Sequence, residues 1–484
     1  MKHCAVLDVG HTHIKVCIVD NHGALLHSVE TSNRVLGADH SPELPDHSLD
    51  PSPDPQPYSY GSAHAYPHYD VDGCWGWFLH QLTQLSQQYS ISSLVTTAHG
   101  AAAALIQRDG ALALPILDYE FPQVASETPE YWALRPPFRE TFSPDLPAGL
   151  NLGRQLYWQQ KQYPDVFTSV DQILTYPQYW SHRLCGIAAT EVTSLGAHTD
   201  LWSPSRQDYS SLVDKQQWRT RFAPLTPAWQ RLGPVKPELL RQIRLDADCE
   251  VLCGIHDSNA AYLRYMAGGH EDCTVVSTGT WVICMAGGTD IGDVEILSDS
   301  RDQLANVDLL GRPLATARFM GGREWAVITQ GERGAPSFTD LEIVLSKGIL
   351  ALPAFSSQGG PFRQNPGYLT QQLESLNQRS ALASLYCALI TDHCLTGIQS
   401  RGDIFVDGAF VQDEIYLRVL ASLRSQQTLY ASTETNGTAL GAALLVNWPE
   451  RRPGNGNTPT RIQPESGSGT ALSDYVDLWR ETLG

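Results

Sequence analysis

Short apolar runs that end at glycine, threonine or aspartate recur along this 484-residue chain. The first two runs, residues 5–9 and 15–20, are separated by the turn Gly10-His11-Thr12-His13. A run of this length, bounded by turn residues, is typical of a buried strand. The pattern predicts an antiparallel hairpin, followed by a third strand around residues 25–26.

The first turn carries residues that suit phosphate chemistry. Gly10 allows a close approach of the backbone to a phosphate, and Thr12 supplies a hydroxyl donor. Asp8, at the end of the strand before the turn, has the ligand type that holds a metal-bound water. A glycine turn after a strand is more often only a hairpin, so this reading depends on the rest of the chain.

A similar hairpin is predicted over residues 274–285. Laid over the first one, Asp8-Val9-Gly10 meets Ser277-Thr278-Gly279, and Thr280 completes the second turn. Two such hairpins, one opening each half, indicate two domains of one fold that face each other across a cleft. Both turns would then clasp one polyphosphate, although two unrelated hairpins sharing a glycine turn by chance remain the alternative.

Two further apolar runs in the first half end at polar groups. Residues 92–97 predict a strand that leads to His99 and Gly100, and ligands commonly bind at such strand ends in α/β sheets. A buried structural histidine is the competing interpretation. Residues 114–118 repeat the pattern as a short strand that ends at Asp118. A helix with apolar positions at helical spacing is expected between residues 75 and 85.

The stretch Gly254 to Ala261 contains the strongest candidate for a catalytic group. Ser258 and Asn259 are good capping residues, so a helix is expected to start here. Asp257 would then lie at the positive end of the helix, which favours the ionised carboxylate. Such a carboxylate can accept a proton from an alcohol as the alcohol attacks phosphorus. The alternative is that Asp257 only caps the helix.

The last third of the chain predicts an apolar helix over residues 381–395 and a buried strand over residues 404–410. That strand leads to a turn at Gly408 and Ala409, with a helix over residues 414–423 after it. Residues 435–443 predict a turn into a helix of small residues, which permits close backbone approach. A final helix over residues 472–479 has an apolar face and is expected to dock on the body.

Composition narrows the class of protein. A formal net charge of -19 and a pI near 5.2 argue against a nucleic-acid partner or an anionic membrane surface. The apolar run at the N-terminus is too short for a signal peptide, and no run reaches the length of a membrane span. The ten cysteines are scattered and mostly lie in apolar runs, which indicates reduced thiols and a cytoplasmic protein. A zinc site at Cys249 and Cys253 is disfavoured because no second ligand pair follows at zinc spacing.

The length predicts two domains. We place an N-terminal domain at residues 1–246 and a C-terminal domain at residues 247–484. Residues 38–67, rich in Pro, Ser, His and Asp, are expected to form a surface loop or insertion. The chain lacks a Gly-x-x-x-x-Gly-Lys-Ser/Thr motif, so its phosphate site must be of another kind.

Together, the ordered motifs resemble the FGGY family of carbohydrate kinases, within the actin-like ATPase superfamily. The resemblance runs over most of the chain, and it lies in the order of the motifs rather than in any one of them. The matching segments are Asp8 to Thr12, Asp70 to Asp72 ahead of Trp75, His99-Gly100, Gly254 to Asp257, Ser277 to Thr280, Gly408-Ala409 and Thr438 to Ala443.

The resemblance implies a fold and a set of roles. The fold is α/β, with two ribonuclease-H-like domains whose mixed five-stranded sheets are flanked by helices. Asp257 would be the catalytic base, and Asp8 would orient Mg²⁺ through water. The sugar would bind at His99, Gly100, Asp118 and His256. The nucleotide, ATP, would bind at Gly10, Thr12, Thr278, Gly279, Thr280, Gly408 and Ala409.

Two details resemble one subgroup, the L-fuculose and L-rhamnulose kinases. They are the run His256-Asp257-Ser258 and the Trp281 that directly follows the second turn. Two departures stand out: His11 occupies the usual position of the first threonine, and Asp407-Gly408-Ala409 replaces three glycines.

The implied activity is transfer of the ATP γ-phosphate to a primary hydroxyl of a ketose such as L-fuculose or L-rhamnulose. The alternatives are a ketopentose kinase of the xylulose or ribulose type, an actin-like or chaperone-like ATPase, and a non-catalytic sugar-binding relative. The expected partners are a small sugar and ATP, without nucleic acid or membrane. The sequence leaves a homodimer open.

Overall fold

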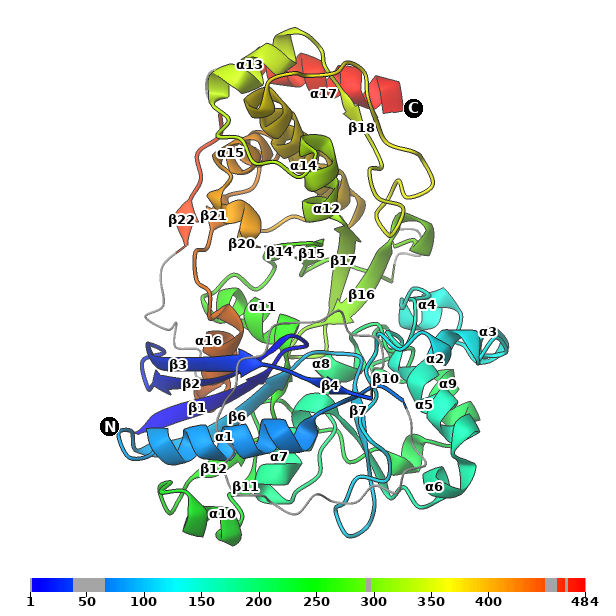
Figure 1. The fold of residues 1–484 in the computed structure, drawn as a ribbon, viewed down its shortest axis with the longest axis vertical. Coiled ribbons are helices and arrows are strands. Elements are labelled where there is room, and N and C mark those ends of the chain that lie inside the picture. Colours follow the sequence, from blue (N-terminus) through cyan, green and yellow to red (C-terminus); the bar gives the residue numbers. More distant parts are fainter. Residues whose placement is uncertain (1, 38–65, 293–296, 449–458, 466–468, 484) are drawn as a thin grey trace.

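The computed structural model describes residues 2–37, 66–292, 297–448, 459–465 and 469–483. It consists of two α/β halves, each built on a mixed sheet with helices on its faces (Figure 1). This confirms the predicted fold class. Apart from residues 66 and 67, the predicted loop at residues 38–67 lies outside the described part of the chain.

The first sheet has the order β11-β12-β6-β1-β2-β3, and β13 pairs with β6. β1 pairs antiparallel with β2 and parallel with β6, and β12 and β13 are both parallel to β6. The predicted hairpin and third strand are confirmed. The strands are β1 (His3–Val9), β2 (His13–Asp20), β3 (Leu25–Ser32), β6 (Ile91–Ala98), β11 (Arg231–Pro234), β12 (Glu250–Leu252) and β13 (Ile255–His256).

Helices and small strand pairs complete the first half. The predicted helix near residues 75–85 is α1 (Val71–Leu85), which begins where the Asp70 carboxylate accepts a hydrogen bond from the Gly73 N–H at 2.8 Å. The other helices are α2 (Gln123–Ser126), α3 (Tyr131–Leu134), α4 (Phe138–Thr141), α5 (Leu152–Gln162), α6 (Pro164–Thr168), α7 (Tyr176–Cys185), α8 (Val192–Leu195), α9 (Ser211–Lys215), η1 (Arg219–Arg221) and α10 (Pro237–Gln242). The pairs are β4 (Val35–Leu36) with β5 (His68–Tyr69), β7 (Ala103–Ile106) with β8 (Gln172–Thr175), and β9 (Trp202–Ser203) with β10 (Asp208–Tyr209).

The second sheet repeats the topology of the first. Its order is β16-β17-β15-β14-β20-β21-β22, with β14 antiparallel to β15 and parallel to β20. Within the described residues each sheet has seven strands, where five were expected. The strands are β14 (Thr274–Thr278), β15 (Val282–Ala286), β16 (Gln303–Val307), β17 (Pro313–Phe319), β20 (Ile404–Gly408), β21 (Leu429–Ala431) and β22 (Thr460–Arg461). The predicted likeness of the two hairpins is confirmed at the level of topology.

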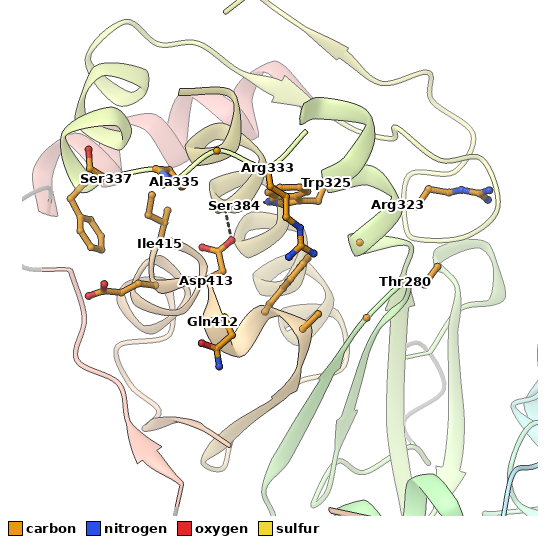
Figure 2. A pocket seen from close by; sticks show the side chains of 18 residues that line it. Thr280, Arg323, Trp325, Arg333, Ala335, Ser337, Ser384, Gln412, Asp413 and Ile415 are labelled. Atoms are coloured by element: carbon orange, nitrogen blue, oxygen red, sulfur yellow. Dashed lines mark hydrogen bonds between the residues drawn. The ribbon is translucent and has the colours of Figure 1, made fainter. Parts of the chain in front are cut away.

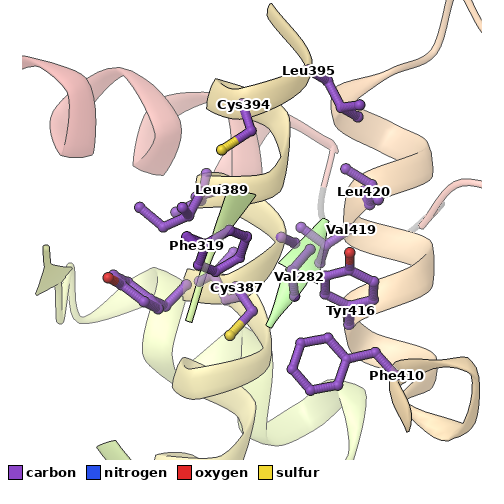
Figure 3. Close-up of a cluster of buried hydrophobic side chains, with 14 of the residues drawn as sticks. Val282, Phe319, Cys387, Leu389, Cys394, Leu395, Phe410, Tyr416, Val419 and Leu420 are labelled. Atoms are coloured by element: carbon purple, nitrogen blue, oxygen red, sulfur yellow. The ribbon is translucent and has the colours of Figure 1, made fainter. Parts of the chain in front are cut away.

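The long apolar helix α14 (Leu376–Gly397) lies against the second sheet with α15 beside it, and their buried side chains interleave (Figure 3). The last helix docks on this body through Leu472, Tyr475, Val476 and Trp479, as its pattern predicted. The remaining helices are α11 (Asp257–Ala267), η2 (Asp299–Arg301), α12 (Gly321–Thr329), α13 (Phe338–Ser346), η3 (Ala409–Gln412), α15 (Glu414–Leu423), α16 (Gly437–Ala443), η4 (Leu444–Asn447) and α17 (Gly469–Leu483), and one further strand pair is β18 (Ala351–Leu352) with β19 (Tyr368–Leu369).

The halves meet at α11 and α16, which lie between the two sheets (Figure 1). α16 follows β21 of the second sheet in sequence yet packs against α11, β1 and β6. A Cβ on Gly441 would lie 1.8 Å from the backbone oxygen of Ala260, so only glycine permits this approach. Buried residues of both halves form one continuous cluster here, from Val6 in β1 to Phe405 in β20.

Two details differ from expectation. Residues 114–118 form no strand: Leu117 makes a single bridge to His68, because Pro115 offers no N–H for a ladder. The first sheet also extends past residue 246, since its last strand ends at His256. Among the described residues, none of the helices has both the length and the hydropathy that a bilayer-crossing segment requires.

Candidate active site

Three parallel strands of the first sheet bring the predicted groups of the first half together. β1 and β13 are both parallel to β6, and Val9 and His256 are each in register with Ala98. The carboxyl ends of parallel strands meet at one edge of a sheet. Asp8, His99 and His256 therefore share that edge, and Asp257 follows immediately as the first residue of α11.

The Asp257 carboxylate is held through one of its oxygens. Oδ1 accepts hydrogen bonds from the Ser258 N–H at 2.5 Å and from the Ser258 hydroxyl at 3.3 Å, and it lies 3.3 Å from Nε2 of His256. Within the described residues, Oδ2 makes no hydrogen bond. The expected helix start is confirmed, and Asp257 is its first residue rather than its cap, which is His256. One oxygen is thus fixed, and the other is free of hydrogen bonds from the described protein.

The imidazole of His256 is fixed in place. Nδ1 lies 2.8 Å from Oδ1 of Asn259, whose Nδ2 donates to the backbone oxygen of Val307. Since that amide must present its oxygen, His256 carries a proton on Nδ1 and turns Nε2 toward Asp257. The backbone N–H of His256 donates to the Thr193 hydroxyl at 3.1 Å, and this hydroxyl donates to Glu191 at 2.5 Å.

Glu191 is fully buried and accepts the backbone N–H of both Thr193 and Ser194. Burial raises the pKa of this carboxyl to about 7. It is connected to the His256 backbone through the Thr193 hydroxyl. Its position indicates that it supports the site rather than taking part in binding.

His99 offers an acceptor to a ligand. Its Nδ1 lies 2.8 Å from the backbone oxygen of Gly100, which can only accept, so Nδ1 carries the proton. Burial lowers the pKa of His99 to about 4, and the neutral ring leaves Nε2 as an acceptor. This Nε2 is buried and has no hydrogen-bond partner in the described protein. Gly100 lies against His256, because a Cβ there would be 2.8 Å from its Nε2.

Asp118 lies beside this group although no strand carries it there. Its Oδ1 accepts hydrogen bonds from the Tyr69 hydroxyl at 3.3 Å and from the Glu120 N–H at 3.1 Å, and it lies 3.5 Å from Nε2 of His11. Burial alone would raise the pKa of Asp118, but these donors hold it below its usual value. Tyr69 and Tyr119 flank His99, with ring centroids 4.9 and 5.5 Å away.

Asp8 is a partly buried carboxylate with a like charge nearby. Burial, and then the neighbouring Asp257, raise the pKa of Asp8 to about 7, against the opposing effect of Lys15. A cation between phosphate and carboxylate would relieve this cost, since Mg²⁺ prefers oxygen ligands and keeps several of its waters. The Asp8 carboxylate therefore has the ligand chemistry needed to hold Mg²⁺ through a water molecule.

A cavity of about 940 Å³ opens in the second half, beside the second glycine turn (Figure 2). Of the predicted nucleotide residues, Gly279, Thr280 and Ala409 line it. Residues that the sequence did not single out supply the rest of the wall: Gly322, Arg323, Trp325, Arg333, Gly334, Ala335, Pro336, Ser337, Phe338, Ser384, Phe410, Gln412, Asp413, Glu414 and Ile415.

The wall of this cavity combines apolar and polar groups. The Arg333 guanidinium lies 5.8 Å from the ring centroid of Trp325, and the Ser384 hydroxyl donates to the Asp413 carboxylate (Figure 2). Asp413 also caps α15 by accepting the Tyr416 N–H. The turn after Gly331 and the paired glycines at the start of α12 were the available sequence signals. Neither signal is specific, because glycines of this kind also occur in ordinary loops.

Two residues predicted to bind the nucleotide make contacts that stabilise the protein's own fold. The Thr278 hydroxyl donates to the backbone oxygen of Asp407 at 2.6 Å and accepts the Phe410 N–H at 2.9 Å. Gly408 has φ 91°, and a Cβ there would lie 2.0 Å from the Thr278 oxygen. Both residues therefore shape the turn that positions Ala409, and the Thr278 hydroxyl is occupied within the protein.

Gly10 and Thr12 lie in the first turn, closed by a hydrogen bond from the Gly10 N–H to the His13 oxygen at 2.9 Å. The second turn is closed similarly, from the Gly279 N–H to the Trp281 oxygen at 2.8 Å. Thr12 is exposed, and its hydroxyl lies 3.0 Å from Nδ1 of His13. Neither Gly10 nor Thr12 lines the 940 Å³ cavity.

Comparison with known proteins gives consistent findings. A family model described as "Carbohydrate kinase FGGY, C-terminal domain" matches residues 270–453. The crystal structure of a carbohydrate kinase from Novosphingobium aromaticivorans is 32% identical, with a TM-score of 0.86, over 99% of this chain and 100% of that one. A xylulose kinase from Lactobacillus acidophilus shares the fold, with a TM-score of 0.74 over 100% of this chain and 98% of that one, at 13% identity.

Curated relatives match over part of their length. An L-fuculokinase from Salmonella typhi is 23% identical over 311 residues, which is 63% of this chain and 60% of the relative. An L-fuculokinase from Escherichia coli K12 is also 23% identical, over 45% of this chain and 46% of the relative. The chain thus spans about half to three fifths of the curated relatives that it matches.

Proposed function

Since this chain belongs to the FGGY family of carbohydrate kinases, we propose that it transfers the γ-phosphate of ATP to a primary hydroxyl of a ketose. The observation that carries the proposal is the Asp257 carboxylate, fixed through Oδ1 and open at Oδ2. It stands at the strand edge that also presents His99 and His256. An alcohol bound at this edge would have a proton acceptor within reach.

In this mechanism Asp257 accepts the hydroxyl proton as the oxygen attacks phosphorus. The Ser258 N–H and hydroxyl keep Asp257 oriented, and His99 accepts a hydrogen bond from another hydroxyl of the sugar. Phosphoryl transfer asks little covalent chemistry of a protein, so positioning and charge stabilisation supply most of the rate. The contacts of Asn259 with His256 serve this positioning.

The nucleotide is proposed to bind in the second half. A cavity of about 940 Å³ has the size of a small-molecule site, and its apolar wall at Trp325 and Phe338 suits a nucleobase. Gly279 and Thr280 lie at its edge and would face the phosphates. Asp8 would hold Mg²⁺ through water, and the ion would neutralise charge on the phosphate oxygens. The first turn, with Gly10 and Thr12, would meet the phosphates from the opposite half.

The proposed substrate class is a 6-deoxy-ketohexose such as L-fuculose or L-rhamnulose. The partial similarity to L-fuculokinases and the His256-Asp257-Ser258 run support this choice. A ketopentose is the alternative, and the likeness to xylulose kinases, at 13 to 16% identity, concerns the fold alone.

The test is a substrate panel with ATP and Mg²⁺, containing L-fuculose, L-rhamnulose, D-xylulose, D-ribulose and glycerol. Release of ADP is measured, and ³¹P NMR locates the phosphate on the product. We expect sugar-dependent ADP release and phosphate on a primary carbon. ADP release that is independent of every sugar would instead support an ATPase machine. Sugar binding without ADP release would support a non-catalytic relative.

A further inference from the structure

The side chain of His11, in the first glycine turn, lies among the residues proposed to bind the sugar. His11 lies 3.5 Å from Asp118 through Nε2, and its ring packs on Tyr119 with centroids 4.6 Å apart. Its centroid is also 5.9 Å from that of His99 and 6.0 Å from that of Tyr69. His11 thus belongs to the group of side chains around His99, although its position in sequence belongs to a phosphate turn.

Two buried nitrogens in this group lack a well-formed hydrogen bond, and that of His11 has only its 3.5 Å contact with the Asp118 carboxylate. Within the described chain, neither Nε2 of His11 nor Nε2 of His99 makes a hydrogen bond, and His99 is only 6% exposed. An unpaired polar atom that is buried costs free energy comparable to a lost hydrogen bond. Nitrogens with so little hydrogen bonding, beside the Asp118 carboxylate, point to a ligand with hydroxyl groups.

The two rings differ in polarity. His99 is neutral with an acceptor at Nε2, as its contact with Gly100 requires. His11 faces the Asp118 carboxylate, which raises the pKa of its imidazole and favours a proton on Nε2. One ring therefore accepts and the other donates. A hydroxyl group can do both, whereas a phosphate oxygen can only accept.

We propose that His11 is a sugar-binding residue that determines specificity, donating from Nε2 to a hydroxyl of a neutral polyhydroxylated substrate. Asp118 holds the His11 ring in place, and Nε2 of His99 accepts a hydrogen bond from a hydroxyl of the same substrate. The phosphates are left to the backbone of the turn and to Thr12. This inference rests on the proposed kinase function and adds a residue that the phosphate-turn motif would assign to the nucleotide.

Two other roles make different predictions. If His11 contacts the phosphates, its loss weakens binding of ATP and leaves binding of the sugar intact. If it is a metal ligand, it acts with Asp118 and Glu120, whose ligand atoms and that of His11 lie within 4.8 Å of one another. Its loss would then abolish binding of a divalent ion such as Zn²⁺ that the protein takes up without ATP.

The test compares His11→Leu, His11→Gln and the control His22→Leu, a change to an exposed histidine in the turn between β2 and β3. KM is measured for ATP and for the panel ketose that the wild-type protein turns over fastest. Losing a hydrogen bond to a charged donor corresponds to roughly 10- to 100-fold in affinity. His11→Leu should raise the KM for the sugar by that factor and leave the KM for ATP within about twofold.

His11→Gln keeps a donor near the position of Nε2 and should recover part of the sugar affinity, while His22→Leu should match the wild type. Calorimetry of the ketose without ATP checks binding directly, and melting temperatures check folding. An unchanged sugar KM in a folded His11→Leu protein would overturn the proposal, as would a rise confined to ATP. So would binding of Zn²⁺ that disappears in the variant. A wild-type protein that neither binds nor phosphorylates any ketose would instead refute the proposed function.

Discussion

A single methyl group added at Gly100 tests the geometry of the site without removing any chemical group. A Cβ there would lie 2.8 Å from Nε2 of His256. Ordinary contact begins near 3.4 Å, so the imidazole must move by about 0.6 Å, the difference between the two distances. Since Asn259 holds its Nδ1 and Thr193 holds its backbone, His256 cannot swing away freely. The shift must disturb the 3.3 Å contact with Asp257.

The magnitude follows from the sensitivity of catalysis to placement. A misplacement of 1 Å can cost about 100-fold, so a shift of about 0.6 Å should lower kcat/KM for the sugar roughly tenfold. This corresponds to about 1.4 kcal/mol of transition-state stabilisation. The KM for ATP should not change, because Gly100 lies outside the cavity beside Gly279. The backbone at Gly100 is compatible with alanine, since Gly100 does not have a positive φ, so any loss of stability comes from the contact with His256.

Steady-state kinetics of Gly100→Ala, His256→Ala and the double variant provide the assay. His256→Ala removes the atoms that the new methyl group would meet, so Gly100→Ala should have little further effect in that background. Such non-additivity is expected for residues in contact. A tenfold loss in both backgrounds would refute the reasoning, as would a kcat/KM for Gly100→Ala within twofold of the wild type.

Three further variants separate ligand contacts from structural ones. In Gly279→Ala the nearest atom to the new Cβ is the Trp281 oxygen at 3.9 Å, so the melting temperature should stay unchanged. The Kd for ATP should rise roughly tenfold, because a phosphate needs the space that the methyl group fills. Unchanged ATP affinity by calorimetry would remove this turn from the phosphate site. Thr278→Val leaves the buried Phe410 N–H without its acceptor, so urea denaturation should show a loss of about 2–4 kcal/mol, and a loss below about 0.5 kcal/mol would contradict the hydrogen-bond assignment. Burial raises the pKa of Glu191 from 4.5 to about 7, so the native state binds the proton more tightly and stability should fall as pH rises from about 4.5 to 7. Glu191→Gln should flatten that decline in denaturation curves taken across this range, and a decline equal to the wild type's would rule out Glu191 as its source.

The sequence predicted what depends on local patterns. Both hairpins, the helix that starts at Asp257 and the small-residue helix at Gly437–Ala443 follow from runs, turns and spacing within about fifteen residues. The likeness of the two sheets followed from comparing one local pattern with another. The alignment of Asp8 with Ser277 is supported by register, because Asp8 faces Thr97 as Ser277 faces Asp407.

The walls of the site could not be predicted in this way. Tyr119, in a loop, and Tyr69, in the short strand β5, meet His99 only in the folded chain, and neither belongs to a periodic pattern. The Thr278 hydroxyl accepts a hydrogen bond from the N–H of Phe410, a residue more than a hundred positions away in sequence. The direction of His11 depends on Asp118, which a proline-containing segment places beside the turn. Contacts between distant segments are set by the whole fold and leave little local signal.

Asp257→Asn gives the most direct test of the central claim, that this carboxylate accepts the proton of the attacking hydroxyl. The measurement is the single-turnover rate constant of phosphoryl transfer from ATP to the best ketose at saturating concentrations of both, together with the Kd for ATP. The account predicts an unchanged Kd, an unchanged melting temperature and a rate constant lower by about 10²–10⁴, the usual worth of a general base. A rate constant within about threefold of the wild type's would contradict it, because a base worth even tenfold would lower the rate more than that.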